Sequence, residues 1–160
     1  MKTLPALLLP AVLAATLAGC TGSFFKSNQP HGFIAPDGPG SALVPLIKAK
    51  MDVAVTGSFA AVRLIRVAPP QLLLLYTNDI DGTAKALGLK PTAKDADVVL
   101  MSPFDPVVWD RRMKAGGLSY VAISQRAIDC LTGIGQMPEE GEALVEWMLE
   151  HEKSWRLPSL

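Results

Sequence analysis

The distribution of apolar and charged residues limits how much of this 160-residue chain can fold into a globular domain. Fourteen of the first twenty residues are apolar, and only Lys2, Lys26 and Asp37 are charged between positions 1 and 41. The other 27 charged residues lie in the last 119 positions. We therefore expect a leader over residues 1–19, a linker over 20–41 and one domain over 42–160.

The leader has the organisation of a secretory signal peptide. Lys2 precedes an apolar run that is too short, and too interrupted by prolines, to span a bilayer as a permanent helix. The run ends in Leu-Ala-Gly-Cys at positions 17–20, which resembles the bacterial lipobox. That resemblance implies cleavage after Gly19, a lipid on Cys20 and an outward-facing protein anchored to a bacterial membrane. The alternative is a cytoplasmic protein, if the leader reflects the choice of start codon or a gene fusion.

The segment over 20–41 contains many glycines and prolines, and its apolar residues do not repeat with the spacing of a helix or a strand. A flexible stalk between membrane and domain is the expected structure. His31 stands alone in this segment, without a second ligand at metal spacing.

From position 42 onward, short apolar runs alternate with helical patterns. Strands are expected over 52–55, 72–76 and 96–101, with a hairpin-like turn at 115–117. Helices are expected over 58–66, 79–87 and 124–131, capped by Ser58, Asp79 and Ser124, and a last helix begins at Pro138. The order predicts an α+β or α/β fold with a small mixed sheet, flanking helices and C-terminal helices. The same order of elements is also compatible with a nucleotidyltransferase-like core.

Two segments carry a family likeness. They are the strand-to-helix segment over 55–61, VTGSFAA, and the run over 124–144, SQRAIDCLTGIGQMPEEGEAL. Together they resemble the C-terminal domain of AbiEi-type antitoxins of type IV toxin–antitoxin systems and of related actinobacterial regulators. The resemblance implies a cytoplasmic protein with a DNA-binding winged helix, whose C-terminal domain opposes a nucleotidyltransferase-like toxin without contacting it directly. Here a lipobox and linker stand where that winged helix would be.

The charge balance argues against nucleic acid as a partner. The chain carries 15 basic and 15 acidic residues, and a polybasic nucleic-acid binder would have a large excess of positive charge. The densest basic group is Arg111, Arg112 and Lys114, and three charges on a turn are typical of a solvated surface. We expect no nucleic-acid binding.

An enzymatic alternative depends on four residues. A strand followed by Gly57-Ser58 and a helix is how the nucleotidyltransferase fold begins, because a helix N-terminus favours phosphate. That chemistry also needs carboxylates for Mg²⁺ on a neighbouring strand, and residues 69–73 contain none. Asp79 and Asp81 flank one apolar residue, which is the acidic-apolar-acidic pattern of such a site, but they follow Ser58 by about twenty residues. Asn78 before them favours a helix cap over a metal site, so we expect neither catalysis nor a cofactor.

Two further residues have ordinary structural explanations. Cys130 sits in a helical apolar pattern, which is typical of a buried thiol and not of a nucleophile. His151 falls on the apolar stripe of the last helix and is expected to be a packing residue.

The function predicted from these features is a non-enzymatic antitoxin- or regulator-like domain that acts through protein contacts and is carried as a lipoprotein. One alternative is an exported lipoprotein with an unrelated binding role. The other is a nucleotidyltransferase-like enzyme that uses Gly57-Ser58 and Asp79/Asp81.

Overall fold

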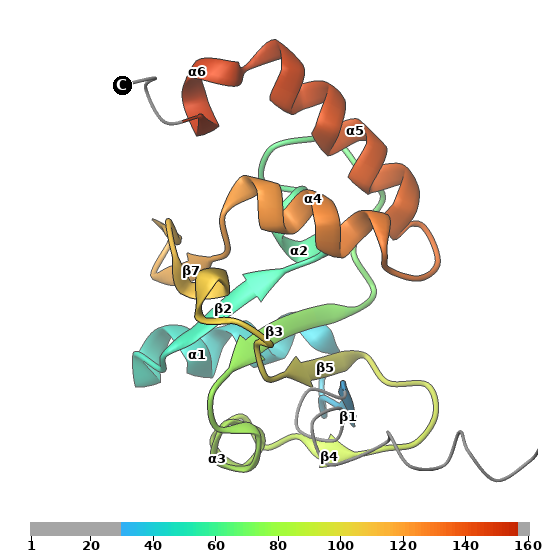
Figure 1. Cartoon of the computed structure of the whole chain (residues 1–160). Coiled ribbons are helices and arrows are strands. Elements are labelled where there is room, and N and C mark those ends of the chain that lie inside the picture. The colour runs from blue at the N-terminus through green and yellow to red at the C-terminus, as the bar shows by residue number, and fades with distance from the viewer. Residues whose placement is uncertain (1–29, 157–160) are drawn as a thin grey trace, which may run out of the picture.

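The structure, a computed structural model, describes residues 30–156 (Figure 1). The predicted leader, the lipidation site Cys20 and the first part of the predicted linker lie outside the described residues. The strands are β1 (His31–Ile34), β2 (Val53–Thr56), β3 (Leu73–Thr77), β4 (Lys90–Pro91), β5 (Val98–Met101), β6 (Met113–Ala115) and β7 (Leu118–Tyr120). The α-helices are α1 (Leu43–Ala49), α2 (Ser58–Ala61), α3 (Ile80–Ala86), α4 (Ile123–Leu131), α5 (Met137–Glu150) and α6 (Glu152–Trp155), and the 3₁₀ helices are η1 (Pro39–Ala42) and η2 (Pro106–Trp109).

The strands form one seven-stranded sheet in the order β4-β1-β5-β3-β2-β7-β6. The pairs β3–β5 and β2–β7 are parallel, and the remaining neighbours are antiparallel. Helices flank this mixed sheet, and α4, α5 and α6 follow it at the C-terminal end. The predicted α+β class is confirmed.

Both faces of the sheet are covered, which explains why its central strands are continuous apolar runs in the sequence. Alternate residues of a strand point to opposite faces. One face packs with α1 and α3, and its buried strand residues are Phe33, Val53, Val55, Leu73, Leu75, Val98, Leu100, Leu118 and Tyr120. On the other face, Leu74 packs with α2, α4 and α5, and Ala54 packs with η2. In Figure 1, α1 passes behind β3, whereas α4 and α5 lie on the other side of the sheet.

The linker prediction is wrong for residues 31–41, which belong to the domain. Strand β1 lies inside the sheet between β4 and β5, and buried Phe33 joins the core. Gly32 is a packing residue, because a Cβ there would lie 3.0 Å from Ala96 Cβ and 3.1 Å from Thr92 O. The Ala35 N–H donates to Asp97 Oδ1 at 2.8 Å, which fixes the chain as it leaves the strand.

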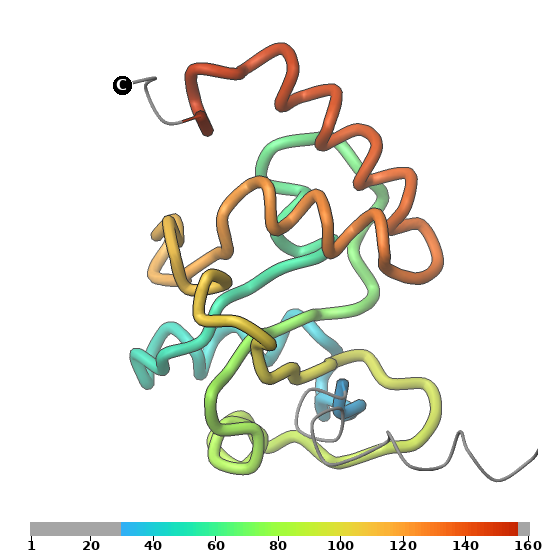
Figure 2. The backbone as a smooth tube through the Cα atoms, viewed as in Figure 1, coloured from blue at the N-terminus to red at the C-terminus, as the bar shows by residue number. Residues whose placement is uncertain are grey.

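Most expected helices are present, with shifted ends. Helix α2 stops at Ala61 and not at 66, although Leu64 and Ile65 in the turn that follows still pack on the core. Helix α4 begins one residue earlier than expected, with Ala122 at the N-cap, so Ser124 is not its cap. Pro138 occupies the first turn of α5, as expected. The smooth trace in Figure 2 shows β1 and α6 at opposite ends of the described region.

Across residues 30–156, every helix is too short or too polar to cross a membrane.

Candidate functional site

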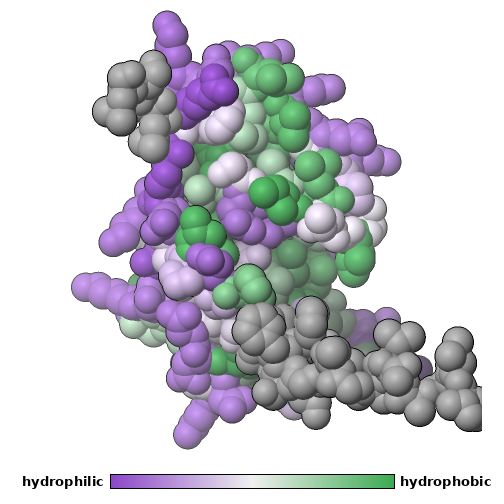
Figure 3. All heavy atoms as spheres, in the orientation of Figure 1, coloured by the Kyte–Doolittle hydropathy of each residue, from purple (hydrophilic) through white to green (hydrophobic). Residues whose placement is uncertain are grey.

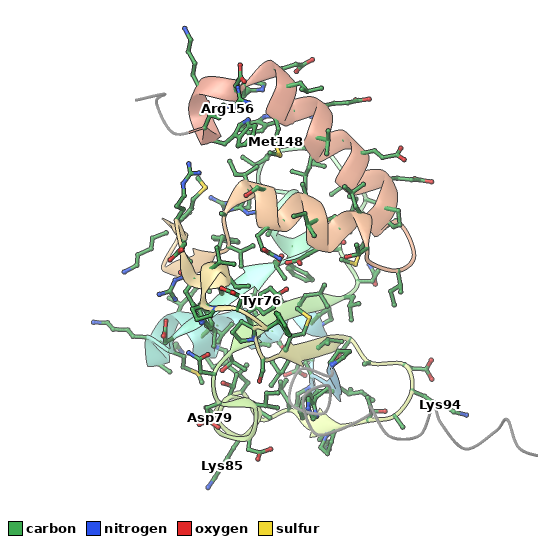
Figure 4. All side chains as sticks on the ribbon, in the orientation of Figure 1. Tyr76, Asp79, Lys85, Lys94, Met148 and Arg156 are labelled. Atoms are coloured by element: carbon green, nitrogen blue, oxygen red, sulfur yellow. The ribbon has the colours of Figure 1, made fainter. Side chains whose placement is uncertain are left out.

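A group of polar side chains joins α4 to the sheet, and we call it the Asp129 cluster. Thr56 Oγ1 donates to Asp129 Oδ2 at 2.6 Å, while Tyr76 OH and Gln125 Nε2 donate to Asp129 Oδ1 at 3.1 and 2.8 Å. Thr56 and Tyr76 come from β2 and β3 on the face that α4 covers, and Tyr76 lies below α4 in Figure 4. Three donors therefore converge on one carboxylate.

Burial dominates the electrostatics of this cluster. Desolvation raises the pKa of the Asp129 carboxyl, although the hydrogen bonds from Thr56, Gln125 and Tyr76 act in the opposite direction. The pKa of the Tyr76 hydroxyl is raised as well, first by burial and then by the neighbouring Asp129 charge. The cluster therefore holds a carboxylate whose charge the fold disfavours.

A second polar contact joins α2 to α5. Ser58 Oγ donates to Glu140 Oε2 at 2.5 Å, and Gln136 Nε2 donates to Glu140 Oε1 at 2.8 Å. Ser58 and Glu140 are both buried. A buried carboxylate needs such partners, so this contact fixes the start of α5 on the core.

This packing contradicts the interpretation of Gly57 and Ser58 as a phosphate cradle. Gly57 has φ +62, and a Cβ at this position would lie 2.9 Å from Leu74 Cδ1 and 2.9 Å from Met137 Cε. The Leu74 and Met137 side chains thus pack directly against the Gly57 backbone. The Ser58 hydroxyl donates to the Glu140 carboxylate, whose negative charge would repel an anion. Ser58 is also not the cap of α2, because Gly57 occupies that position.

Asp79 and Asp81 lie at the other end of the sheet from Ser58. Strands β2 and β3 are antiparallel, with Val53 opposite Thr77. The segment that follows β2 and the segment that follows β3 therefore start at opposite ends of the strands. The strand length alone separates those ends by roughly 10 Å. Figure 4 shows Asp79 far from α5. The four candidate residues of the enzymatic alternative therefore do not form one site.

Asp79 acts as the N-cap of α3, as its sequence context indicated. Its Oδ1 accepts from the Gly82 N–H at 2.9 Å. A surface hollow of about 320 Å³ lies beside it and is also lined by Asp52 and Thr83. Within residues 30–156, no three His, Cys, Asp or Glu side chains gather closely enough to hold a metal ion.

The cap predicts the outcome of a simple substitution. Asp79→Ala should lower the free energy of unfolding by about 1 kcal/mol, because one N–H at the start of α3 loses its acceptor. Asp79→Asn should keep most of that stability, since the amide oxygen can accept the same bond. Denaturant unfolding with and without Mg²⁺ checks this. Stabilisation by Mg²⁺ that disappears in Asp79→Ala would instead identify a metal ligand.

Arg126 is a buried cation that the sequence reasoning did not single out. Its Nε donates to Val121 O at 3.0 Å and its Nη1 to Ala60 O at 3.4 Å. Its guanidinium lies 5.3 Å from the centre of the Tyr120 ring. Burial lowers the pKa of Arg126 to about 10. Arg126 therefore ties the first turn of α4 to α2 and β7.

The remaining predicted residues are ordinary parts of the fold. Cys130 is fully buried, and burial raises the pKa of its thiol to about 12, as expected for a packing residue. His151 does not join the buried stripe: it is exposed and stacks on Trp147 with ring centres 4.4 Å apart. Arg112 pairs with Asp52 at 2.5 Å and lies over the Trp109 ring, whereas Arg111 and Lys114 are exposed.

Exposed apolar side chains gather on the hairpin of α4 and α5. This α4–α5 face consists of Ile128, Leu131, Ile134, Val145 and Leu149, which are 38 to 77% exposed. Figure 3 shows hydrophobic residues over both helices on the visible side. Single exposed apolar residues are common, but several on one short supersecondary unit are typical of an interaction surface.

Comparisons with known proteins found no matching family model, no matching curated protein and no matching solved structure.

Proposed function

We propose that this domain is a non-enzymatic antitoxin- or regulator-like module, carried on a lipoprotein leader, that acts by protein contact through the α4–α5 face. One observation carries the proposal: five large apolar side chains are exposed on a single helical hairpin. Burying such side chains against a partner contributes roughly 25 cal/mol per Å² of apolar surface. The resemblance of residues 124–144 to the antitoxin family covers this same hairpin.

The hairpin is held in place before any partner arrives. The Asp129 cluster fixes α4 on the sheet, and the Ser58–Glu140 contact fixes α5. Gly141 lets the helices approach closely, since a Cβ there would lie 2.6 Å from Leu131 N. A rigid surface loses little conformational entropy on binding, which favours association.

The alternatives receive less support from the geometry. The enzymatic alternative needs Gly57-Ser58 and Asp79/Asp81 in one site, and they lie at opposite sheet edges. An exported lipoprotein with an unrelated binding role would use the same face on a different partner. A growth assay separates that alternative from the antitoxin-like role.

The test is co-expression of the chain with a nucleotidyltransferase-like toxin in the cytoplasm of a bacterial host. The wild-type chain should restore growth, and the double variant Ile128→Asp with Leu149→Asp should not. Two charges on the face remove apolar contact and place carboxylates against the partner, which we expect to weaken binding by about 2–4 kcal/mol. Thermal unfolding should stay close to wild type, because both side chains are largely exposed.

Val44→Asp provides the matched control. Val44 is 53% exposed on α1, across the sheet, and Ile128 is 55% exposed. The control should rescue growth as well as wild type does. Equal rescue by the α4–α5 double variant would refute protein contact at this face, and no rescue by the wild-type chain at matched expression would refute the antitoxin-like role.

A further inference from the structure

Helix α5 carries four exposed carboxylates along one side, and we call them the acidic edge. They are Glu139, Glu142, Glu146 and Glu150. Their spacing of three, four and four residues places them on one helical face over roughly 16 Å. No lysine or arginine occurs between Met137 and Glu150, so this helix presents charge of a single sign.

The acidic edge borders the apolar residues of the α4–α5 face. Gly141 is the residue of α5 that meets α4, and Val145 and Leu149 follow it at spacings of four, so they lie between α4 and the acidic edge. On α4, Leu131 contacts α5 at Gly141, and Ile128 lies one turn away. In Figure 4, side chains that end in oxygen project outward from α5, away from α4. The surface is therefore a row of exposed apolar side chains that is bordered on one side by the four carboxylates of the acidic edge.

These carboxylates have no basic partner among the described residues. The ion pairs within residues 30–156 are Arg112–Asp52 and Arg156–Glu152, and neither involves the acidic edge. The side chains of the edge also form no hydrogen bond with the described part of the chain. Four like charges at neighbouring helical positions repel one another, and a bound cationic group would relieve that repulsion.

We propose that the α4–α5 face binds a basic amphipathic helical segment of a partner protein. The partner's apolar side chains pack on Ile128, Leu131, Val145 and Leu149, while its lysines or arginines pair with the acidic edge. The proposal rests on the proposed function, in which this face is the contact surface, and adds the chemistry of the partner. Helix-in-groove recognition uses this combination of apolar anchors and flanking charge.

Other candidate partners carry negative charge, which the acidic edge would repel. Nucleic acid and an anionic lipid surface would both bring negative groups to the acidic edge. A second copy of the chain, joined by a two-fold axis through this face, would place one α5 acidic edge near the other. A basic segment is the occupant whose charge complements all four glutamates.

The experiment measures fluorescence anisotropy of two labelled helical peptides titrated with the full-length chain. Both peptides carry leucines at helical spacing; one has lysine at every polar position and the other has glutamate. The Leu/Lys peptide should bind, and raising the salt from about 0.1 M to about 1 M should weaken it, because the Debye length falls from about 10 Å to about 3 Å. The Leu/Glu peptide should not bind.

Charge reversal then locates the site. Glu142→Lys with Glu146→Lys should weaken the Leu/Lys peptide about tenfold, since two attractive pairs become repulsive ones. Asp37→Lys with Asp110→Lys makes the same change in net charge on exposed residues of other segments and should leave binding unchanged. Equal weakening by both pairs, or equal binding of the two peptides, would overturn the proposal.

The two proposals fail separately. If growth rescue requires Ile128 and Leu149 but tolerates Glu142→Lys with Glu146→Lys, the contact surface stands and the basic partner is refuted. If both pairs of substitutions leave rescue intact, the proposed function itself is refuted.

Discussion

Gly141→Ala is expected to destabilise the domain by about 2 kcal/mol, even though alanine is the better helix former by about 1 kcal/mol. A Cβ at this position would lie 2.6 Å from Leu131 N and 3.0 Å from Leu131 Cα. These are backbone atoms of α4, so no rotamer change can make room. The two helices must therefore move apart, which disturbs the core beneath them. Urea unfolding of the two proteins measures the difference.

Gly40→Ala is the matched control, because a Cβ at Gly40 would have no heavy atom within 4 Å. That substitution should be neutral or slightly stabilising, since alanine restricts the unfolded chain more than glycine does. Gly141→Val should cost more than Gly141→Ala, in proportion to the larger overlap. A Gly141→Ala protein as stable as wild type would show that α4 and α5 do not cross this closely.

Asp129→Ala is expected to cost about 2–4 kcal/mol, because it leaves the donors of Thr56, Tyr76 and Gln125 without their shared acceptor. Asp129→Asn should cost much less. Its amide oxygen can accept from Tyr76 and Gln125, and its amide nitrogen can donate to the Thr56 hydroxyl. Chemical unfolding at neutral pH should therefore place the asparagine variant close to wild type and the alanine variant well below it.

The difference in stability between wild type and Asp129→Asn should depend on pH, because the pKa of Asp129 is raised in the folded state. The folded state binds the proton more tightly than the unfolded state, whose carboxyl has its ordinary pKa of 3.8. The stabilisation is thus fully present below that unfolded pKa and is lost as the pH rises through the higher folded pKa. Wild type should gain stability relative to Asp129→Asn as the pH falls from about 7 to about 4. A relative loss of stability for wild type at low pH would contradict this prediction.

The three central strands β2, β3 and β5 were predictable, because they are covered on both faces and are therefore continuous apolar runs. Leu73, Leu74 and Leu75 illustrate this, since neighbours along the strand enter different cores. Strand β1 was not predictable, because Gly32 and the nearby prolines have the composition of a linker. Only pairing with β4 and β5, more than fifty positions away, shows that β1 belongs to the sheet.

The polar contacts of the site could not be predicted from the sequence, because their partners are also far apart along the chain. Thr56 and Asp129 are 73 positions apart, and Ser58 and Glu140 are 82 apart, so no local spacing signals either contact. Gly57-Ser58 also has two explanations in sequence. A phosphate cradle and a tight interior turn both need a glycine, and only the packing of Leu74 and Met137 distinguishes them. Asp79 was predictable as a cap, because its partner lies three residues away.

The central claim is that the α4–α5 face contacts a protein, and site-specific photocrosslinking in growing cells tests it most directly. A photoreactive amino acid is placed at Leu149 in one strain and at Val44 in another, under conditions in which the chain restores growth. We predict a discrete crosslinked adduct with one protein from position 149, lost when Ile128→Asp is added, and no adduct from position 44. Adducts of equal yield from both positions, or none from position 149 while growth is restored, would contradict the claim.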